Sequence, residues 1–194
     1  MEKLKHKNYY IITIVIAIVY SFIFSRVLFP RVPDYYRMSY IDNKVDTYGT
    51  ENMYNYTLGN KIDLNFLKKN ICSLSKGWSF IEDDGIWSNG KKSQICFYFN
   101  KNIKKDTVFK LKIQYLANGV PNQFKVNVND GNNEIVRFNE NNEASFAIKK
   151  DTLKKGFNFI NFYWDKTYRP GLIGENNDGR ELCVKLVSFM IIEK

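Results

Sequence analysis

Histidine is nearly absent from this chain of 194 residues, and its single copy, His6, lies ahead of a long apolar segment. The remainder therefore has no histidine for Ser-His-Asp or Cys-His catalysis, nor for histidine-rich transition-metal sites. It also lacks a glycine-rich phosphate-binding loop. An enzyme built on carboxylates with Arg169 or Arg180 is the alternative, but no spacing requires one. We therefore predict a protein that is not an enzyme and has no metal ion or cofactor.

Cysteine is also scarce, with three copies at Cys72, Cys96 and Cys183 and no CxxC spacing. An odd number without such spacing argues against a zinc site and against a small fold that depends on disulfides. Cys96 and Cys183 each lie inside an apolar strand pattern. We predict that both are small buried hydrophobic residues.

Acidic residues are outnumbered, and the formal net charge is +9. Four of the basic residues precede position 30, and the surplus of the remainder is spread as adjacent lysine pairs next to predicted turns. Lysine there solvates strand ends and protects sheet edges from unwanted pairing. The charge therefore does not predict a nucleic-acid partner.

Residues 9–29 form a continuous apolar run with a single charge, Arg26. As a helix rising about 1.5 Å per residue, this run would span roughly 30 Å, the thickness of a bilayer core. A cleaved signal peptide is the alternative, but its apolar part covers about 7–15 residues and ends at a small-residue site that residues 25–30 lack. We predict an uncleaved transmembrane signal anchor, with Tyr9, Tyr10 and Tyr20 as interfacial residues.

The flanks of this segment predict its orientation. Residues 1–8 are short and basic, whereas a long region follows the segment, and long regions are translocated largely regardless of their charge. We therefore predict a cytoplasmic N-terminus and a single-pass protein of the inner membrane. Pro30 and Pro33 end the helix, residues 30–59 form a stalk, and residues 60–194 form an extracytoplasmic domain.

After residue 60 the sequence is dominated by strand patterns. Apolar and polar residues alternate in 62–66, 108–116, 124–128 and 157–164, which predicts half-buried strands. The stretches 95–99 and 182–192 are more continuously apolar, and Asp130-Gly131 is typical of a hairpin turn. About ten short strands without a long helix predict an all-β fold, an antiparallel β-sandwich or jelly roll. A closed barrel is the alternative.

Residues 77–90 place two tryptophans and three carboxylates within one predicted hairpin, whose turn is residues 82–85. The carboxylates Glu82, Asp83 and Asp84 suit a solvated turn, a ligand or calcium contact, or a catalytic pair. Trp78 and Trp87 are either core residues or surfaces on which a sugar ring stacks.

A second candidate region is the long polar loop over residues 168–182, because long loops in compact domains are often functional. Asp178 and Arg180 within it either pair with each other, reach a ligand, or hold the loop in place through hydrogen bonds. These roles remain open at the level of the sequence.

Two separated motifs carry a resemblance to a known group of proteins. They comprise Gly77, Trp78, Ser79, Glu82, Gly85, Trp87, Ser88 and Gly90, and then Pro170, Gly174, Asp178, Arg180 and Leu182. This pattern resembles a carbohydrate-binding-like β-sandwich module of bacterial membrane proteins that make surface polysaccharides. In that group, similar modules accompany glycosyltransferases and phosphoglycerol-transferase-like proteins and face away from the cytoplasm. The resemblance implies a role in the polysaccharides of the cell envelope.

We therefore predict a membrane-anchored accessory protein that binds carbohydrate or supports the assembly of cell-surface polysaccharide. The predicted partners are the membrane and either a glycan or a membrane-bound glycosyltransferase. The alternative is a structural subunit that docks on such a transferase without binding glycan. The predicted ligand-binding residues are Trp78, Glu82, Asp84, Trp87, Asp178 and Arg180.

Overall fold

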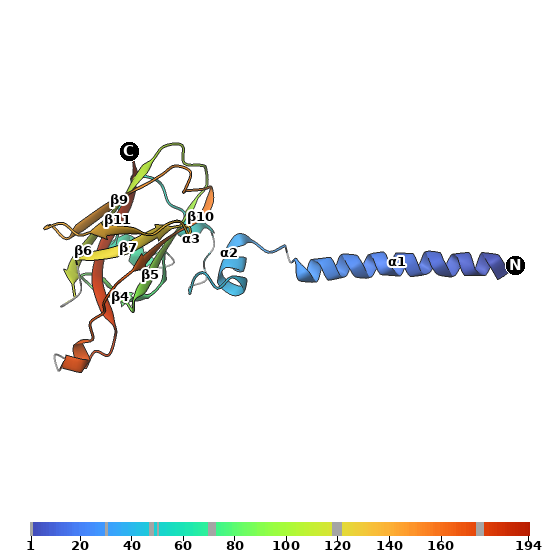
Figure 1. Ribbon diagram of the computed structural model, residues 1–194, viewed down its shortest axis with the longest axis horizontal. Helices are drawn as coiled ribbons and strands as arrows, with labels where there is room; N and C mark the ends of the chain where they lie inside the picture. The colour runs from blue at the N-terminus through green and yellow to red at the C-terminus, as the bar shows by residue number, and fades with distance from the viewer. Residues whose placement is uncertain are drawn as a thin grey trace.

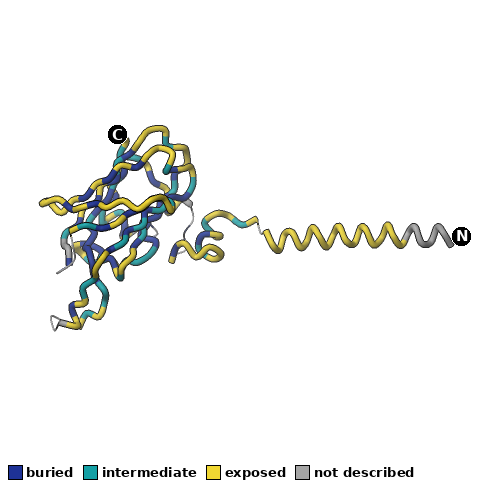
Figure 2. The backbone as a smooth tube through the Cα atoms, in the orientation of Figure 1, coloured by how far each residue is buried: buried dark blue, intermediate teal, exposed yellow. Residues whose placement is uncertain are grey.

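The computed structural model describes residues 2–29, 31–46, 49, 51–69, 73–117, 122–173 and 177–194. A single helix, α1 (Glu2–Leu28), projects from a β-rich body (Figure 1). Its apolar part, Tyr9–Leu28, has a mean hydropathy of 2.4 and buries none of its surface against the body (Figure 2). The predicted N-terminal apolar helix is thus confirmed, and its length and composition suit a membrane anchor or a signal sequence.

The body consists of two antiparallel sheets, which confirms the prediction of an all-β sandwich. The six-stranded sheet has the order β3-β4-β11-β6-β9, with β1 also paired to β11, and the five-stranded sheet has the order β2-β5-β10-β7-β8. The strands are β1 (Ile62–Asp63), β2 (Leu74–Lys76), β3 (Trp78–Ile81), β4 (Ile86–Asn89), β5 (Lys92–Phe99), β6 (Thr107–Leu116), β7 (Gln123–Val128), β8 (Glu134–Arg137), β9 (Glu143–Ile148), β10 (Gly156–Tyr163) and β11 (Leu182–Glu193).

The core lies between the sheets and is filled by the inward side of each alternating strand. In β6, Phe109, Leu111 and Ile113 are buried, whereas Lys110 and Lys112 between them are exposed. Period-two alternation produces this division because successive side chains point to opposite faces of a strand. On β6, the outward side chains Lys110 and Lys112 therefore make the exposed side of the strand polar.

A second apolar cluster covers the five-stranded sheet from outside. Met38, Val45 and Tyr54 are buried there against Cys96 and Phe157. These first three residues come from the range predicted as a stalk, which contains α2 (Asp34–Tyr36), a π-helical turn (Arg37–Ile41) and α3 (Glu51–Tyr54). Apolar contacts on both faces explain the continuous apolar pattern of β5.

Tyr56 connects this N-terminal region to the six-stranded sheet. Its hydroxyl accepts a hydrogen bond from the backbone N–H of Ile191 at 2.7 Å, and its own backbone N–H donates to the carbonyl of Tyr98 at 2.9 Å. Burial raises the pKa of Tyr56 to about 12. A tyrosine so placed links both sheets to the preceding segment.

The predicted strand over residues 62–66 is wrong beyond Asp63. A carboxylate oxygen of Asp63 accepts a hydrogen bond from the backbone N–H of Phe66 at 3.1 Å. This contact caps the start of the short helix α4 (Leu64–Lys69). The cap overrides the alternation of apolar residues, so the chain turns into a helix after two residues of strand.

The turn predicted at Asp130-Gly131 lies one residue earlier. Asn129 and Asp130 have positive φ angles of 50° and 61°, and the backbone N–H of Gly131 donates to the carbonyl of Val128 at 3.0 Å. Asn and Asp tolerate this left-handed conformation at the two central positions of a hairpin turn. Gly131 follows the turn and begins the return to β8.

Candidate functional site

The hairpin β3–β4 forms as predicted, with residues 82–85 as its turn. The backbone N–H of Glu82 donates to the carbonyl of Gly85 at 2.9 Å. A Cβ at Gly85 would lie 2.7 Å from the Lys185 side chain and 2.9 Å from the Leu186 carbonyl oxygen. The absence of a side chain therefore lets the turn approach β11 closely, which brings Glu82 and Asp84 next to Lys185.

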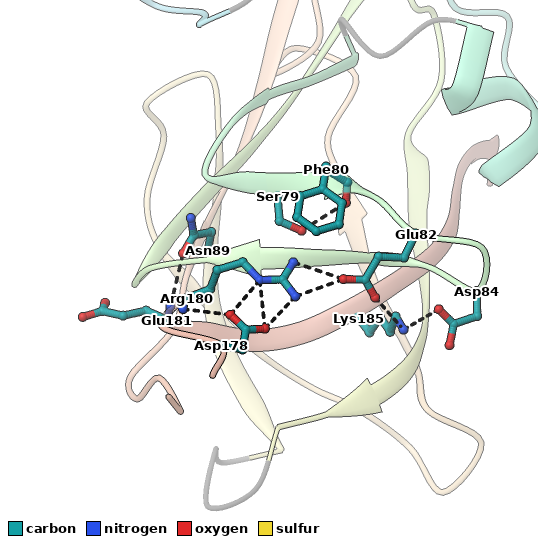
Figure 3. Close-up of polar contacts among 9 residues, drawn as sticks. All are labelled: Ser79, Phe80, Glu82, Asp84, Asn89, Asp178, Arg180, Glu181 and Lys185. Carbon is teal, nitrogen blue, oxygen red and sulfur yellow. Dashed lines mark hydrogen bonds and ion pairs between the residues drawn. The ribbon is translucent and has the colours of Figure 1, made fainter. Parts of the chain in front are cut away.

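Five charged residues meet where this turn, β11 and the loop after Tyr168 come together. We call them the ion-pair clamp: Glu82, Asp84, Asp178, Arg180 and Lys185 (Figure 3). The Arg180 guanidinium donates to Asp178 through Nε at 3.0 Å and Nη2 at 2.7 Å. Nη1 and Nη2 each donate to Glu82 Oε1 at 3.1 Å. Arg180 thus joins the two motifs that are separated in the sequence.

Lys185 completes the clamp from the neighbouring strand. Its side chain is only 8% exposed, and its Nζ lies 2.9 Å from Glu82 Oε2 and in contact with Asp84 Oδ1. Lys185 is the direct cross-strand neighbour of Trp87, and its Nζ lies 5.7 Å from the centre of that ring. A nearly buried ammonium is thus compensated by two carboxylates and an aromatic face.

Contacts within the clamp favour the charged forms of Asp84, Asp178, Arg180 and Lys185. Hydrogen bonds from Arg180 lower the pKa of Asp178, and the hydrogen bond from Lys185 lowers the pKa of Asp84. Burial alone would lower the pKa of Lys185, but its hydrogen bonds to Asp84 and Glu82 outweigh burial and raise it. Three carboxylates and two cations leave the clamp with one net negative charge.

The contacts within the clamp are dense enough to give it a structural role. Each oxygen of Asp178 accepts hydrogen bonds from Arg180, and both oxygens of Glu82 contact a cation. Asp83 points away into solvent, 3.6 Å from Lys68. Within the described parts of the chain, no group of three or more His, Cys, Asp or Glu side chains is placed to hold a metal ion. The clamp therefore fastens the hairpin to the loop and to β11.

The two tryptophans have different environments, although both are partly buried and pack against the core. Trp78 donates from Nε1 to the carbonyl of Gln94 at 2.9 Å, and its ring meets Phe162 edge-on at 6.4 Å. It therefore connects β3 to the opposite sheet. Trp87 lies beside the clamp under Lys185.

An exposed aromatic ring that the sequence analysis did not select lies on the clamp. Phe80 is 67% exposed, and the Arg180 guanidinium is 4.8 Å from the centre of its ring. We call this pair the hairpin platform (Figure 3). Because two carboxylates hold the guanidinium, the ring rests on a fixed cationic support.

Two further residues of the site were missed at the sequence level. Lys185 is the only charged residue within the apolar stretch 182–192, which is the one signal that marks it. Gln114 of β6 hydrogen-bonds to Asp84, while its Oε1 is buried without a partner among the described residues. No pattern in the sequence distinguishes Gln114 from the other outward-facing residues of β6.

The cysteine predictions are confirmed where the structure describes them. Cys96 and Cys183 are both buried, and Cys72 lies outside the described residues. Burial raises the pKa of the Cys183 thiol to about 12. That thiol donates to the carbonyl of Lys166 at 3.4 Å, so it acts as a structural residue beneath the loop.

No family model and no curated protein matches this chain. Among solved structures, a family GH115 4-O-methyl-α-glucuronidase with specificity for decorated arabinogalactans is 14% identical, with a TM-score of 0.40, over 72% of this chain and 18% of that chain. A family 35 carbohydrate-binding module from Clostridium thermocellum is 13% identical, with a TM-score of 0.39, over 69% and 98%. The family 35 module of Cellvibrio japonicus Abf62 is 9% identical, with a TM-score of 0.37, over 61% and 80%.

Proposed function

We propose that this protein is a glycan-binding module held at a membrane, and that the hairpin platform receives the sugar. The observation that carries this proposal is the exposure of Phe80. A phenyl ring that is 67% exposed and fixed over a guanidinium presents a flat apolar surface to solvent. The apolar face of a pyranose ring is complementary to such a surface.

Polar groups beside the ring supply the directional contacts that a sugar requires. Arg180 Nη1 donates to Glu82 alone within the described residues, which leaves its second hydrogen for a ligand hydroxyl. An aromatic surface with a few fixed polar groups is the usual composition of a small-ligand site.

The same proposal gives α1 the role of a membrane anchor. Its apolar part rises about 30 Å at about 1.5 Å per residue, and its side chains make no contact that buries them in the body. Three lysines occur within the first seven residues, which favours a cytoplasmic N-terminus and an extracytoplasmic body. The protein then binds a glycan outside the membrane and catalyses no reaction on it.

The two motifs that resemble polysaccharide-assembly modules suggest the setting of this activity. The clamp joins residues of both motifs, Glu82 from the first and Arg180 from the second. In this setting the partner is a membrane glycosyltransferase that makes the glycan, and the module holds the product near it. Affinity capture through a C-terminal tag compares the partners of the wild-type chain with those of Phe80→Ala. Loss of the transferase only in Phe80→Ala would show that this partner requires the platform.

The glycan proposal is tested with the full chain in detergent micelles on a panel of immobilised glycans. Phe80→Ala should weaken binding at least about tenfold, as loss of an exposed aromatic anchor does at other interfaces. Ile135→Ala is the matched control, because Ile135 is 65% exposed and lies on β8 of the other sheet. Binding of a neutral glycan that survives in Phe80→Ala, or the absence of any bound neutral glycan, would refute the platform.

The membrane proposal has its own test. In intact spheroplasts, the C-terminal body should be digested by added protease, while a tag placed before α1 should be protected. The chain should also stay in the membrane fraction after alkaline carbonate washing. Release of the body into the soluble fraction would identify α1 as a cleaved signal sequence instead.

A further inference from the structure

A hollow lies on the outer face of the six-stranded sheet, away from the platform. Its volume is about 470 Å³, and its lining comes from β6, β9, β11, the residue before β1 and Asn139 in the turn before β9. The lining residues that bear polar groups include Lys61, Lys110, Lys112, Glu143, Ser145 and Ser188. None of these was selected from the sequence.

The register of the sheet explains why these residues lie together. Lys112 is paired with Glu143 on one side and with Ser188 on the other. Lys110 is paired with Ser145 and with Met190 in the next row of the same face. Residues two apart on one strand are about 7 Å apart on the same face. The pairing therefore builds two parallel rows, each with a lysine at its centre.

The charges in this hollow are largely uncompensated. Lys61 and Lys110 are exposed and make no ion pair with any residue that the structure describes. Lys112 contacts Glu143 at 3.4 Å, and both side chains are about half exposed, at 51% and 49%. Three lysines face one carboxylate, so the lining carries two net positive charges.

A second hollow of about 530 Å³ adjoins the first, because Asn139 lines both. It is lined by the carboxylate of Glu140 and by further amides, those of Asn122, Asn141 and Asn142. The two hollows together therefore hold three lysines and two carboxylates, with one net positive charge. The side-chain oxygen of Asn139 accepts from the backbone N–H groups of Asn141 and Glu143, which fixes it at the junction. We call the two hollows together the lysine trough.

We propose that the lysine trough binds an anionic glycan, independently of the hairpin platform. The lysines pair with the carboxylates or phosphates of the polymer, and the asparagine amides bond to its hydroxyls. The aromatic residues of the lining, Phe138 and Phe189, are only 7% and 2% exposed. A trough without accessible rings offers no stacking surface for nucleic-acid bases, so a sugar polymer fits its chemistry better.

The experiment measures binding of the full chain, in detergent micelles, to polygalacturonate, poly(glycerol phosphate) and neutral dextran. We expect binding to at least one of the two polyanions, with the preference identifying carboxylate or phosphate as the recognised group. The affinity should fall when NaCl is raised from about 0.05 M to about 0.5 M, since exposed charges are then screened. Dextran should not bind in the trough.

The variant Lys61→Gln/Lys110→Gln should weaken polyanion binding at least about tenfold, whereas Glu143→Gln should strengthen it. The control Lys125→Gln/Lys154→Gln removes two exposed lysines outside the trough and should leave binding within about twofold. Phe80→Ala should also leave it unchanged, so the trough and the platform are tested separately. Equal losses in both lysine pairs, or equal binding of dextran and polyanions by Phe80→Ala, would overturn the proposal.

Discussion

The ion-pair clamp and the lysine trough belong to the same sheet but differ in the burial and the pairing of their lysines. In the clamp, Lys185 is 8% exposed and lies 2.9 Å from Glu82. In the trough, Lys112 is 51% exposed and Lys110 has no ion-pair partner within the described chain. Burial makes an unpaired charge costly, while solvent removes that cost. The clamp therefore uses its charges for the fold, and the trough keeps its charges available for a ligand.

The largest effect should follow Arg180→Met, which leaves Glu82 and Asp178 partly uncompensated. Their side chains are 23% and 21% exposed, so we expect a loss below that of a fully buried pair, about 2 kcal/mol. Thermal unfolding of the full chain in detergent should then shift down by about 4–8 °C. Lys110→Met in the trough is the control and should shift little.

A double-mutant cycle sharpens this test. Glu82→Gln should cost less in the Arg180→Met background than in the wild type, because its guanidinium partner is already gone. Additive losses would show that the clamp does not couple these residues, and the contrast with the trough would then disappear.

The next largest effect should come from Lys185→Met. Methionine fills similar space, Glu82 keeps its contacts with Arg180, and Asp84, which is 48% exposed, can be solvated. We therefore expect a loss of about 1 kcal/mol, visible as a lower midpoint in urea unfolding. A larger loss of unfolding free energy than in Arg180→Met would show that Lys185 contributes more to the stability of the clamp than Arg180 does.

The fold could be predicted from the sequence because period two and turn residues are local signals. The turn after β3 and the burial of Cys96 and Cys183 follow from such signals. The first motif supplies Glu82 and the second supplies Asp178 and Arg180, but only the sandwich topology shows that they meet. Sequence separation hides such pairing because local patterns do not specify which strands become neighbours.

The platform was hidden for a different reason. The register of β3 against β4 shifts between Trp78 and Ile81, so alternation cannot tell which side Phe80 faces. The role of Lys185 could not be predicted because a single lysine in an apolar strand is also typical of a sheet edge, and the sequence does not show its carboxylate partners. The trough could not be predicted because two of its lysines come from β6 and the third, Lys61, precedes β1 and lies far from them in the sequence.

Acid should distinguish the clamp from the trough. Asp178 has a folded-state pKa below its unfolded value of about 3.9. Its contribution to stability is therefore present above that value and is lost as the pH falls through the lowered pKa. The difference in melting temperature between wild type and Asp178→Asn should be largest near neutral pH and shrink below about pH 4. A difference independent of pH would mean that the carboxylate charge does not stabilise the fold.

The smallest effect should follow Lys61→Gln/Lys110→Gln, the variant that removes the two trough lysines without an ion pair to a described residue. Neither lysine forms an ion pair with a described residue, and substitutions at exposed positions without special contacts usually change stability by less than about 0.5 kcal/mol. Its melting temperature should thus stay within about 2 °C of the wild type. A clear destabilisation would show that these lysines support the sheet, and a clear stabilisation would show that their mutual repulsion destabilises the folded state.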